Sequence, residues 1–166
     1  MIRVATIPST STTFKIGTYH YSFEVLIMTY ISKHAEKYKD QLYFVFRVFV
    51  GLLFLQHGLQ KLLGLFGGVG GDGVAITIFS LMGLAGVIEC LAGLGIAFGF
   101  FTRLVAVVAA VEMVVAFFMA HWPQGWVPLL NKGELSLLYF AAFLILVVYG
   151  SGKWNLEKAL INEEMF

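Results

Sequence analysis

The sequence has little cysteine and little charge. Cys90 is the only cysteine among 166 residues, which excludes an intramolecular disulfide and thiol–disulfide chemistry within one chain. Asp, Glu, Lys and Arg together make up 13% of the residues, whereas soluble domains are about 25% charged. The net charge of +1 argues neither for nor against nucleic acid as a partner, but the apolar composition of the chain speaks against it.

Local patterns for common cofactors and for targeting are also missing. The Gly-rich run at 67–73 lies between two apolar segments instead of after a strand, which argues against a phosphate-binding loop. His57 and His121 differ by about 9 Å in estimated depth, which disfavours paired haem ligands. No ligand pair four apart on one helix supports a metal, so we predict none. The N-terminus lacks the ordered regions of a cleavable signal peptide.

Apolar residues are abundant and are gathered into long runs. Hydrophobic residues make up 59% of the chain and mean hydropathy is +0.84, which indicates an integral membrane protein with one compact domain. The four apolar stretches are 41–66, 74–98, 104–122 and 134–149. A membrane span needs about 20 residues, so the fourth is marginal unless Leu129 and Leu130 extend it. The short connections predict an all-α, up-down-up-down four-helix bundle.

The distribution of Lys and Arg predicts the orientation. One side would hold Lys33, Lys37, Lys39, Arg103, Lys153 and Lys158, and the other would hold Lys61 and Lys132. The positive-inside rule then places both termini in the cytoplasm. The bundle would occupy residues 41–153, followed by a short cytoplasmic tail at 154–166.

Residues 1–40 lie outside the bundle and are polar or aromatic without a clear period. Two interpretations stay open for this N-terminal extension. It is either an interfacial or disordered segment at the membrane, or upstream sequence translated ahead of a native start at Met28. Residues 32–40 within it resemble a solvated turn or a short amphipathic helix that leads into the first span.

Four ionisable residues lie inside the apolar stretches: Arg47, His57, Glu89 and Glu112. Burying such groups in hydrocarbon costs several kcal/mol unless they are paired, protonated or wetted. Helical spacing places Arg47 and Glu89 together on the cytoplasmic side of the bilayer centre, and it places Glu112 near the centre as a further candidate for the same cluster. This inner cluster is either an ion pair that fixes helix register or a proton-handling site, because two carboxylates exceed one guanidinium. A stripe of small residues beside Glu89 favours close helix packing.

A second, outer cluster would gather His57, Gln60, Lys61, His121 and Glu134. A quinone head group has two carbonyl acceptors on an apolar ring, and such donors near the membrane surface would suit it. We assign catalytic roles to His57 and Glu134, and quinone binding to Gln60, Lys61, His121 and Tyr139. The alternative is that Lys61 snorkels to the interface and Glu134 caps its helix.

The order of several short motifs resembles the DoxX family of small four-helix membrane proteins. The resemblance rests on RVFVGLLFLQHGLQK at 47–61, Glu89 with Gly93, FTR at 101–103, and Gly133-Glu134 with Tyr139. It covers about residues 37–153, while Glu112 has no assigned place in the pattern. The family includes the membrane subunit of a thiosulfate:quinone oxidoreductase and a mycobacterial member associated with redox-stress proteins.

The resemblance implies a bacterial or archaeal plasma-membrane protein. The expected function is a membrane subunit of an oxidoreductase that interacts with quinone and with a redox partner protein. A non-enzymatic assembly or interaction factor and a small transporter remain as alternatives, although no internal repeat supports a transporter. The expected partners are the lipid bilayer and the redox partner, and a homo-oligomer is compatible with the sequence.

Overall fold

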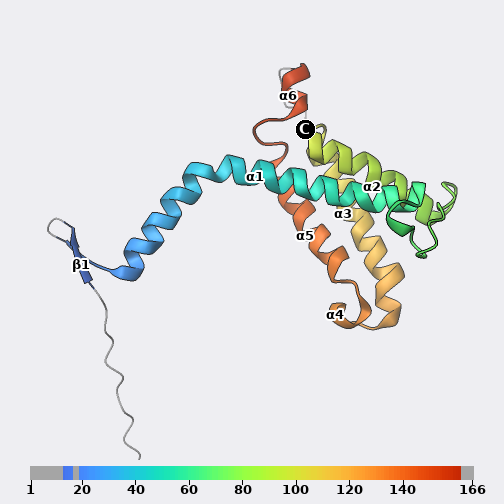
Figure 1. The fold of residues 1–166 in the computed structure, drawn as a ribbon, viewed down its shortest axis with the longest axis horizontal. Coiled ribbons are helices and arrows are strands. Elements are labelled where there is room, and N and C mark those ends of the chain that lie inside the picture. Colours follow the sequence, from blue (N-terminus) through green and yellow to red (C-terminus); the bar gives the residue numbers. More distant parts are fainter. Residues whose placement is uncertain (1–12, 17–18, 162–166) are drawn as a thin grey trace, which may run out of the picture. The chain divides into compact units, whose positions relative to one another are not determined.

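The computed structural model describes residues 13–16 and 19–161, with side chains from Phe23 to Leu160. The chain divides into two compact units, Met1–Lys39 and Asp40–Phe166. Three helical segments are long and apolar enough to cross a membrane: Phe23–Leu63, Leu81–Phe98 and Thr102–Gln124. The fourth expected span is a shorter apolar helix, Glu134–Tyr149. The described residues are therefore mainly helical, as predicted (Figure 1).

The first unit contains structure that the sequence did not indicate. Strands β1 (Thr13–Ile16) and β2 (Tyr19–Ser22) form a short antiparallel hairpin. Helix α1 (Phe23–Leu63) starts directly after it and continues into the second unit. Of the two alternatives for residues 32–40, a turn or a short helix, the structure shows helix, and these residues are part of α1. The rest of residues 1–22 lies outside the described part.

The second unit contains the remaining helices. In chain order they are η1 (Leu65–Gly67), α2 (Leu81–Phe98), α3 (Thr102–Ala116), η2 (Phe117–His121), η3 (Trp122–Gln124), α4 (Pro128–Asn131), α5 (Glu134–Tyr149) and α6 (Leu156–Ile161). Helix α2 starts later than the predicted residue 74 because Ser80 caps it, accepting a hydrogen bond from the Gly83 amide at 3.0 Å. The bounds of α5 match the prediction.

Helices α1 and α2 pack antiparallel with their backbones in contact. A Cβ atom added to Gly51 would lie 2.5 Å from the Ala97 nitrogen, and one added to Gly58 would lie 2.6 Å from the Cys90 nitrogen. The predicted small-residue stripe on α2 is therefore confirmed as a packing surface. Such close approach gains dispersion energy and weak backbone contacts that do not depend on water.

Helices α3 and α5 also run antiparallel and form most of the core. The small residues Ala106 and Ala109 of α3 are fully buried, as are Phe143 and Leu146 of α5. Phe54 of α1 belongs to the same core cluster, and its ring centroid lies 4.8 Å from that of Phe143. Small residues on one helix facing large ones on the other let the two surfaces interdigitate.

The segment after α5 packs on the same end of the unit as the α2–α3 turn. Tyr43 donates a 2.6 Å hydrogen bond to the Gly150 carbonyl, and the Glu157 amide donates to the Gly99 carbonyl at 3.4 Å. The Lys153 ammonium lies 2.6 Å from the Asp40 carboxylate. The first residues of the predicted tail, 154–157, are thus part of the folded unit.

Candidate functional site

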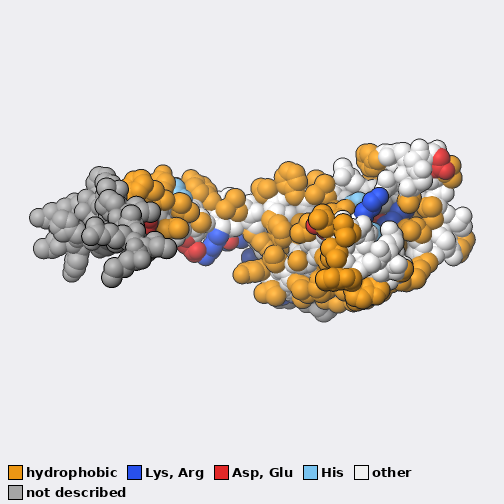
Figure 2. Space-filling model, turned by 90° about the horizontal axis from the view of Figure 1, so that it is seen from below, with side chains coloured by type: hydrophobic (Ala, Val, Ile, Leu, Met, Phe, Trp, Pro, Cys, Tyr) orange, Lys and Arg blue, Asp and Glu red, His pale blue; other side chains and the backbone are white. Residues whose placement is uncertain are grey.

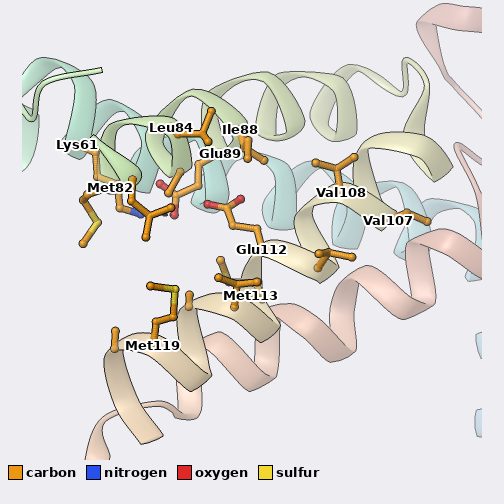
Figure 3. A pocket seen from close by; sticks show the side chains of 16 residues that line it. Lys61, Met82, Leu84, Ile88, Glu89, Val107, Val108, Glu112, Met113 and Met119 are labelled. Atoms are coloured by element: carbon orange, nitrogen blue, oxygen red, sulfur yellow. Dashed lines mark hydrogen bonds and ion pairs between the residues drawn. The ribbon is translucent and has the colours of Figure 1, made fainter. Parts of the chain in front are cut away.

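A cavity with a volume of about 460 Å³ lies between α2 and α3 (Figure 3). Its walls are almost entirely aliphatic side chains and methionines. The lining includes Leu81, Met82, Leu84, Ala85, Ile88, Val107, Val108, Val111, Met113, Val115, Ala116, Met119 and Ala120. Three ionisable residues complete it, Lys61 from α1, Glu89 from α2 and Glu112 from α3. A large apolar cavity with a few convergent polar groups is the usual form of a ligand site.

The cavity opens on the outer surface of the helices. Leu84 of α2 is 53% exposed and Val111 of α3 is 60% exposed, although both line the cavity. Hydrophobic side chains also cover much of the visible face of this unit (Figure 2). In a membrane-spanning bundle, an exposed apolar face of this kind contacts lipid. A ligand dissolved in the bilayer can therefore reach the cavity from the side.

Lys61 and Glu89 form an ion pair that connects α1 to α2 inside this cavity. Glu89 is 3% exposed and the Lys61 side chain is 16% exposed. Lys61 donates to Oε1 of Glu89. The other carboxylate oxygen, Oε2, accepts no hydrogen bond from the described residues. The pair is buried, so its attraction is only weakly screened by solvent.

Glu112 brings a second carboxyl group to the same place. Neither of its buried oxygen atoms accepts a hydrogen bond from any described residue. The side chain points from α3 toward Glu89 on α2 (Figure 3). Buried polar atoms are normally satisfied by a partner. Three unsatisfied carboxyl oxygens in one apolar cavity are therefore the strongest indication of a ligand in the described part of the chain.

The predicted ion pair between Arg47 and Glu89 is wrong. Arg47 is fully buried and donates hydrogen bonds to the carbonyls of Ile96 at 2.8 Å, Ala97 at 3.2 Å and Trp154 at 2.9 Å. The carbonyls of the last helical turn have no intrahelical partner and carry partial negative charge. Arg47 therefore caps the C-terminus of α2, and Lys61 takes the place assigned to it beside Glu89.

The later start of α2 explains this error. Counting α2 from residue 74 places Glu89 on the cytoplasmic side of the helix centre, near Arg47. Counting from Leu81 to Phe98 places Glu89 at the helix centre. The contact of Gly58 with Cys90 confirms that Glu89 lies at the level of the turn holding His57. The inner and outer clusters expected from the sequence are therefore not separate, since Lys61 and Glu89 come from different ones.

Most other members of the predicted outer cluster have separate local partners. Gln60 donates to the Gly68 carbonyl at 3.1 Å, and the His121 Nδ1 atom lies 3.0 Å from the Asn131 carbonyl oxygen. The His57 ring meets the Tyr139 ring edge-on at 5.7 Å. Glu134 is exposed in the first turn of α5. None of these residues lines the large cavity.

Tyr139 instead lines a second, smaller cavity of about 200 Å³. The other residues lining it are Val50, Leu53, Leu135, Leu138 and Ala142. No charged side chain lines this cavity, so it offers a ligand only van der Waals contact.

Several buried polar residues could not be identified from the sequence. Asn131 is fully buried, with its amide donating to the Gly125 carbonyl at 2.6 Å and its oxygen accepting from the Gly133 amide at 2.8 Å. Glu157 is fully buried although it follows the last predicted span. No spacing or composition signal marks either residue. The methionines and valines of the cavity wall were likewise indistinguishable from ordinary lipid-facing residues.

Three apolar spanning helices and a cavity with buried charges define an integral membrane protein. The model of the DoxX family matches residues 42–122. An uncharacterized protein of Haemophilus influenzae is 35% identical over 137 residues, which cover 78% of this chain and 98% of that protein. The chain belongs to the DoxX family, as its motifs indicated. No solved structure matches it.

Proposed function

We propose that this chain is a plasma-membrane subunit of an oxidoreductase that binds quinone, while a partner protein supplies the electron donor. The observation that carries this proposal is the meeting of Lys61, Glu89 and Glu112 inside an apolar cavity that opens on the outer face of the helices. The proposed quinone site is therefore this cavity and not the predicted outer cluster. Of the residues predicted to bind quinone, only Lys61 lines the cavity.

The chemistry of a quinone matches this cavity. Its ring and isoprenoid tail are apolar and dissolve in lipid, which suits the aliphatic walls and the lateral opening. Its carbonyl oxygens gain negative charge on reduction, and an ammonium group such as that of Lys61 stabilises developing charge in a dry site. Reduction to hydroquinone takes two electrons from the partner's donor and two protons. Glu89 and Glu112 are the groups positioned to exchange protons there.

The same proposal includes four membrane spans and two cytoplasmic termini. Helix α5 has 16 residues, which reach about 24 Å at 1.5 Å per residue. This length is a little short of the hydrocarbon core of about 30 Å. The antiparallel packing of α3 and α5 supports α5 as a fourth span. The Lys and Arg distribution supports the orientation.

Quinone retention tests the proposed function. The protein is purified from its native membranes with any bound partner, and quinone is extracted and quantified per chain. We expect quinone in the wild type and in Glu36→Gln, whose exposed side chain does not line the cavity. Val111→Phe, which narrows the cavity while leaving its charges in place, should lose most of it. Equal and negligible quinone in all three proteins would refute the proposal and favour a membrane assembly or interaction factor.

A further inference from the structure

We infer that the cavity between α2 and α3 is built for the hydroquinone form and binds it more tightly than the oxidised quinone. The inference rests on the proposed function and specifies which redox form the site prefers. It follows from a comparison of the hydrogen-bond donors and acceptors that the cavity presents with those that each form of the ligand carries.

The cavity presents an excess of acceptors. Oε2 of Glu89 and both oxygens of Glu112 are buried and accept no hydrogen bond from the described residues. Glu89 is 3% exposed, so solvent does not satisfy its free oxygen. Both carboxyl groups line the same cavity (Figure 3). A buried acceptor without a donor loses its hydration and gains nothing in return.

The donors of the cavity come from one side chain. The Lys61 ammonium has three N–H groups, and one of them is given to Glu89. A quinone carbonyl can accept from the remaining N–H groups but has nothing to donate to the carboxyl oxygens. A hydroquinone hydroxyl does both, because its oxygen accepts while its hydrogen donates. Only the hydroquinone therefore satisfies Lys61 and the carboxyl groups together.

This conclusion holds for either protonation state of Glu112. As a carboxylate, Glu112 presents two acceptor oxygens next to the free oxygen of Glu89. As a carboxylic acid it gains one donor, but its carbonyl oxygen and Oε2 of Glu89 still lack donors. In both cases at least one acceptor is left without a donor. A quinone cannot supply that donor, whereas each hydroquinone hydroxyl supplies one.

The shape of the site allows an aromatic ring to reach these groups. The volume of about 460 Å³ falls in the usual range of small-molecule sites, about 300–1,000 Å³. Exposed lining residues such as Leu84 and Val111 leave the outer face open. The alkyl tail can therefore remain in the lipid while the ring lies between the helices.

Preferential binding of the reduced form changes the energetics of the bound couple. Each tenfold preference for hydroquinone raises the midpoint potential of the bound two-electron couple by about 30 mV relative to the free pool. The site would then draw electrons from the partner's donor toward bound quinone. A membrane subunit can promote electron transfer in this way without holding a redox group of its own.

Direct binding measurements on the purified full-length chain test the inference. The probes are a decyl-substituted benzoquinone, its hydroquinone kept reduced under anaerobic conditions, and the dimethoxy ether of that hydroquinone. The ether keeps the ring and tail but cannot donate a hydrogen bond. We expect the hydroquinone to bind at least tenfold more tightly than the quinone or the ether, in detergent and in lipid nanodiscs.

Two variants locate the effect. Glu112→Gln keeps the shape of the side chain but replaces one acceptor oxygen with a donor amide, so the preference for hydroquinone should fall severalfold. Glu36→Gln makes the same chemical change at an exposed side chain that does not line the cavity and should leave the preference unchanged. An undiminished preference in a folded Glu112→Gln protein would overturn the role given to the Glu112 carboxyl group.

The wild-type protein alone separates the inference from the proposed function. Equal binding of quinone and hydroquinone, or tighter binding of quinone, overturns the inference while the quinone-linked function stands. Binding of the ether as tightly as the hydroquinone also overturns it, because the hydroxyl hydrogens would then contribute nothing. Failure of all three probes to bind overturns the proposed function and the inference together.

Discussion

The Lys61 ammonium and the Glu89 carboxylate form a buried ion pair that links the end of α1 to the middle of α2. The two residues are separated by 28 positions in sequence. Removing one partner of such a pair leaves an uncompensated charge, whereas removing both leaves neutral groups. The link between the two helices should therefore be strongly non-additive under mutation.

We expect Lys61→Met to lower the free energy of unfolding by about 3–5 kcal/mol, because Glu89 is left buried without its cation. Adding Glu89→Gln should recover much of that loss. Denaturant unfolding in detergent, followed by tryptophan fluorescence, measures both proteins. Two losses that simply add would show that the two side chains do not interact in the folded protein.

Arg47 should behave independently of Glu89. We expect Arg47→Met to lower the free energy of unfolding by about 3 kcal/mol, because three backbone carbonyls, two of them in buried hydrogen bonds, lose a charged donor. In the double variant Arg47→Met with Glu89→Gln, the two losses of unfolding free energy should add to within about 0.5 kcal/mol. Arg103→Met is the matched control, since Arg103 is exposed and reaches the Val148 carbonyl only at 3.5 Å. A strong coupling between Arg47 and Glu89 would restore the pairing expected from the sequence.

The backbone contact of α1 and α2 predicts unequal effects for two buried glycines. Gly58→Ala should cost about 1–3 kcal/mol, since its new Cβ would lie 2.6 Å from the Cys90 nitrogen and 2.8 Å from the Gly86 carbonyl oxygen. Gly86→Ala should cost clearly less, because the nearest neighbours of its new Cβ are not backbone atoms, and the closest, Leu62 Cγ and Lys61 Cβ, lie farther away at 3.0 Å. Thermal unfolding of both variants checks the order, and a reversed order would contradict the packing described.

Cysteine labelling in intact cells tests the orientation. In a Cys90→Ala background, Asp72→Cys lies in the exposed loop between α1 and α2, and Lys153→Cys lies after α5. The positive-inside rule places residue 72 outside the cell and residue 153 in the cytoplasm. An impermeant maleimide should label the former alone, and both should react after permeabilisation. Labelling of residue 153 in intact cells would reverse the proposed topology.

Much of the helical fold could be predicted because apolar run length and small-residue spacing act locally. The bounds of α5 and the packing stripe around Gly93 followed from these signals. The start of α2 could not be predicted as well, since residues 74–80 are apolar enough to read as membrane helix. The helix begins only after its N-cap residue, Ser80, seven residues inside the apolar run.

The candidate site depended on that boundary. The side chains that carry it, Glu89 and Glu112, were recognised from the cost of placing carboxyl groups in apolar helices. The partner of Glu89 was not recognised, because the later start of α2 shifts Glu89 by about one helical turn relative to the helix centre. This shift changes which cation lies at its level. The wall of the cavity was also hidden, since lipid-facing and ligand-facing valines are chemically identical in a sequence.

The hydrogen bond from Arg47 to the Trp154 carbonyl has a consequence for biogenesis. Arg47 enters the membrane with the first helix, but its last acceptor is synthesised more than 100 residues later. Until the ribosome has passed that residue, Nη2 of the guanidinium group lacks the acceptor that it has in the folded protein. The set of hydrogen bonds that Arg47 makes is therefore completed only when synthesis of the chain is nearly finished. A protein truncated before Trp154 would lack this acceptor for Arg47. Membrane proteases could distinguish that end of the bundle from the same end of the finished molecule.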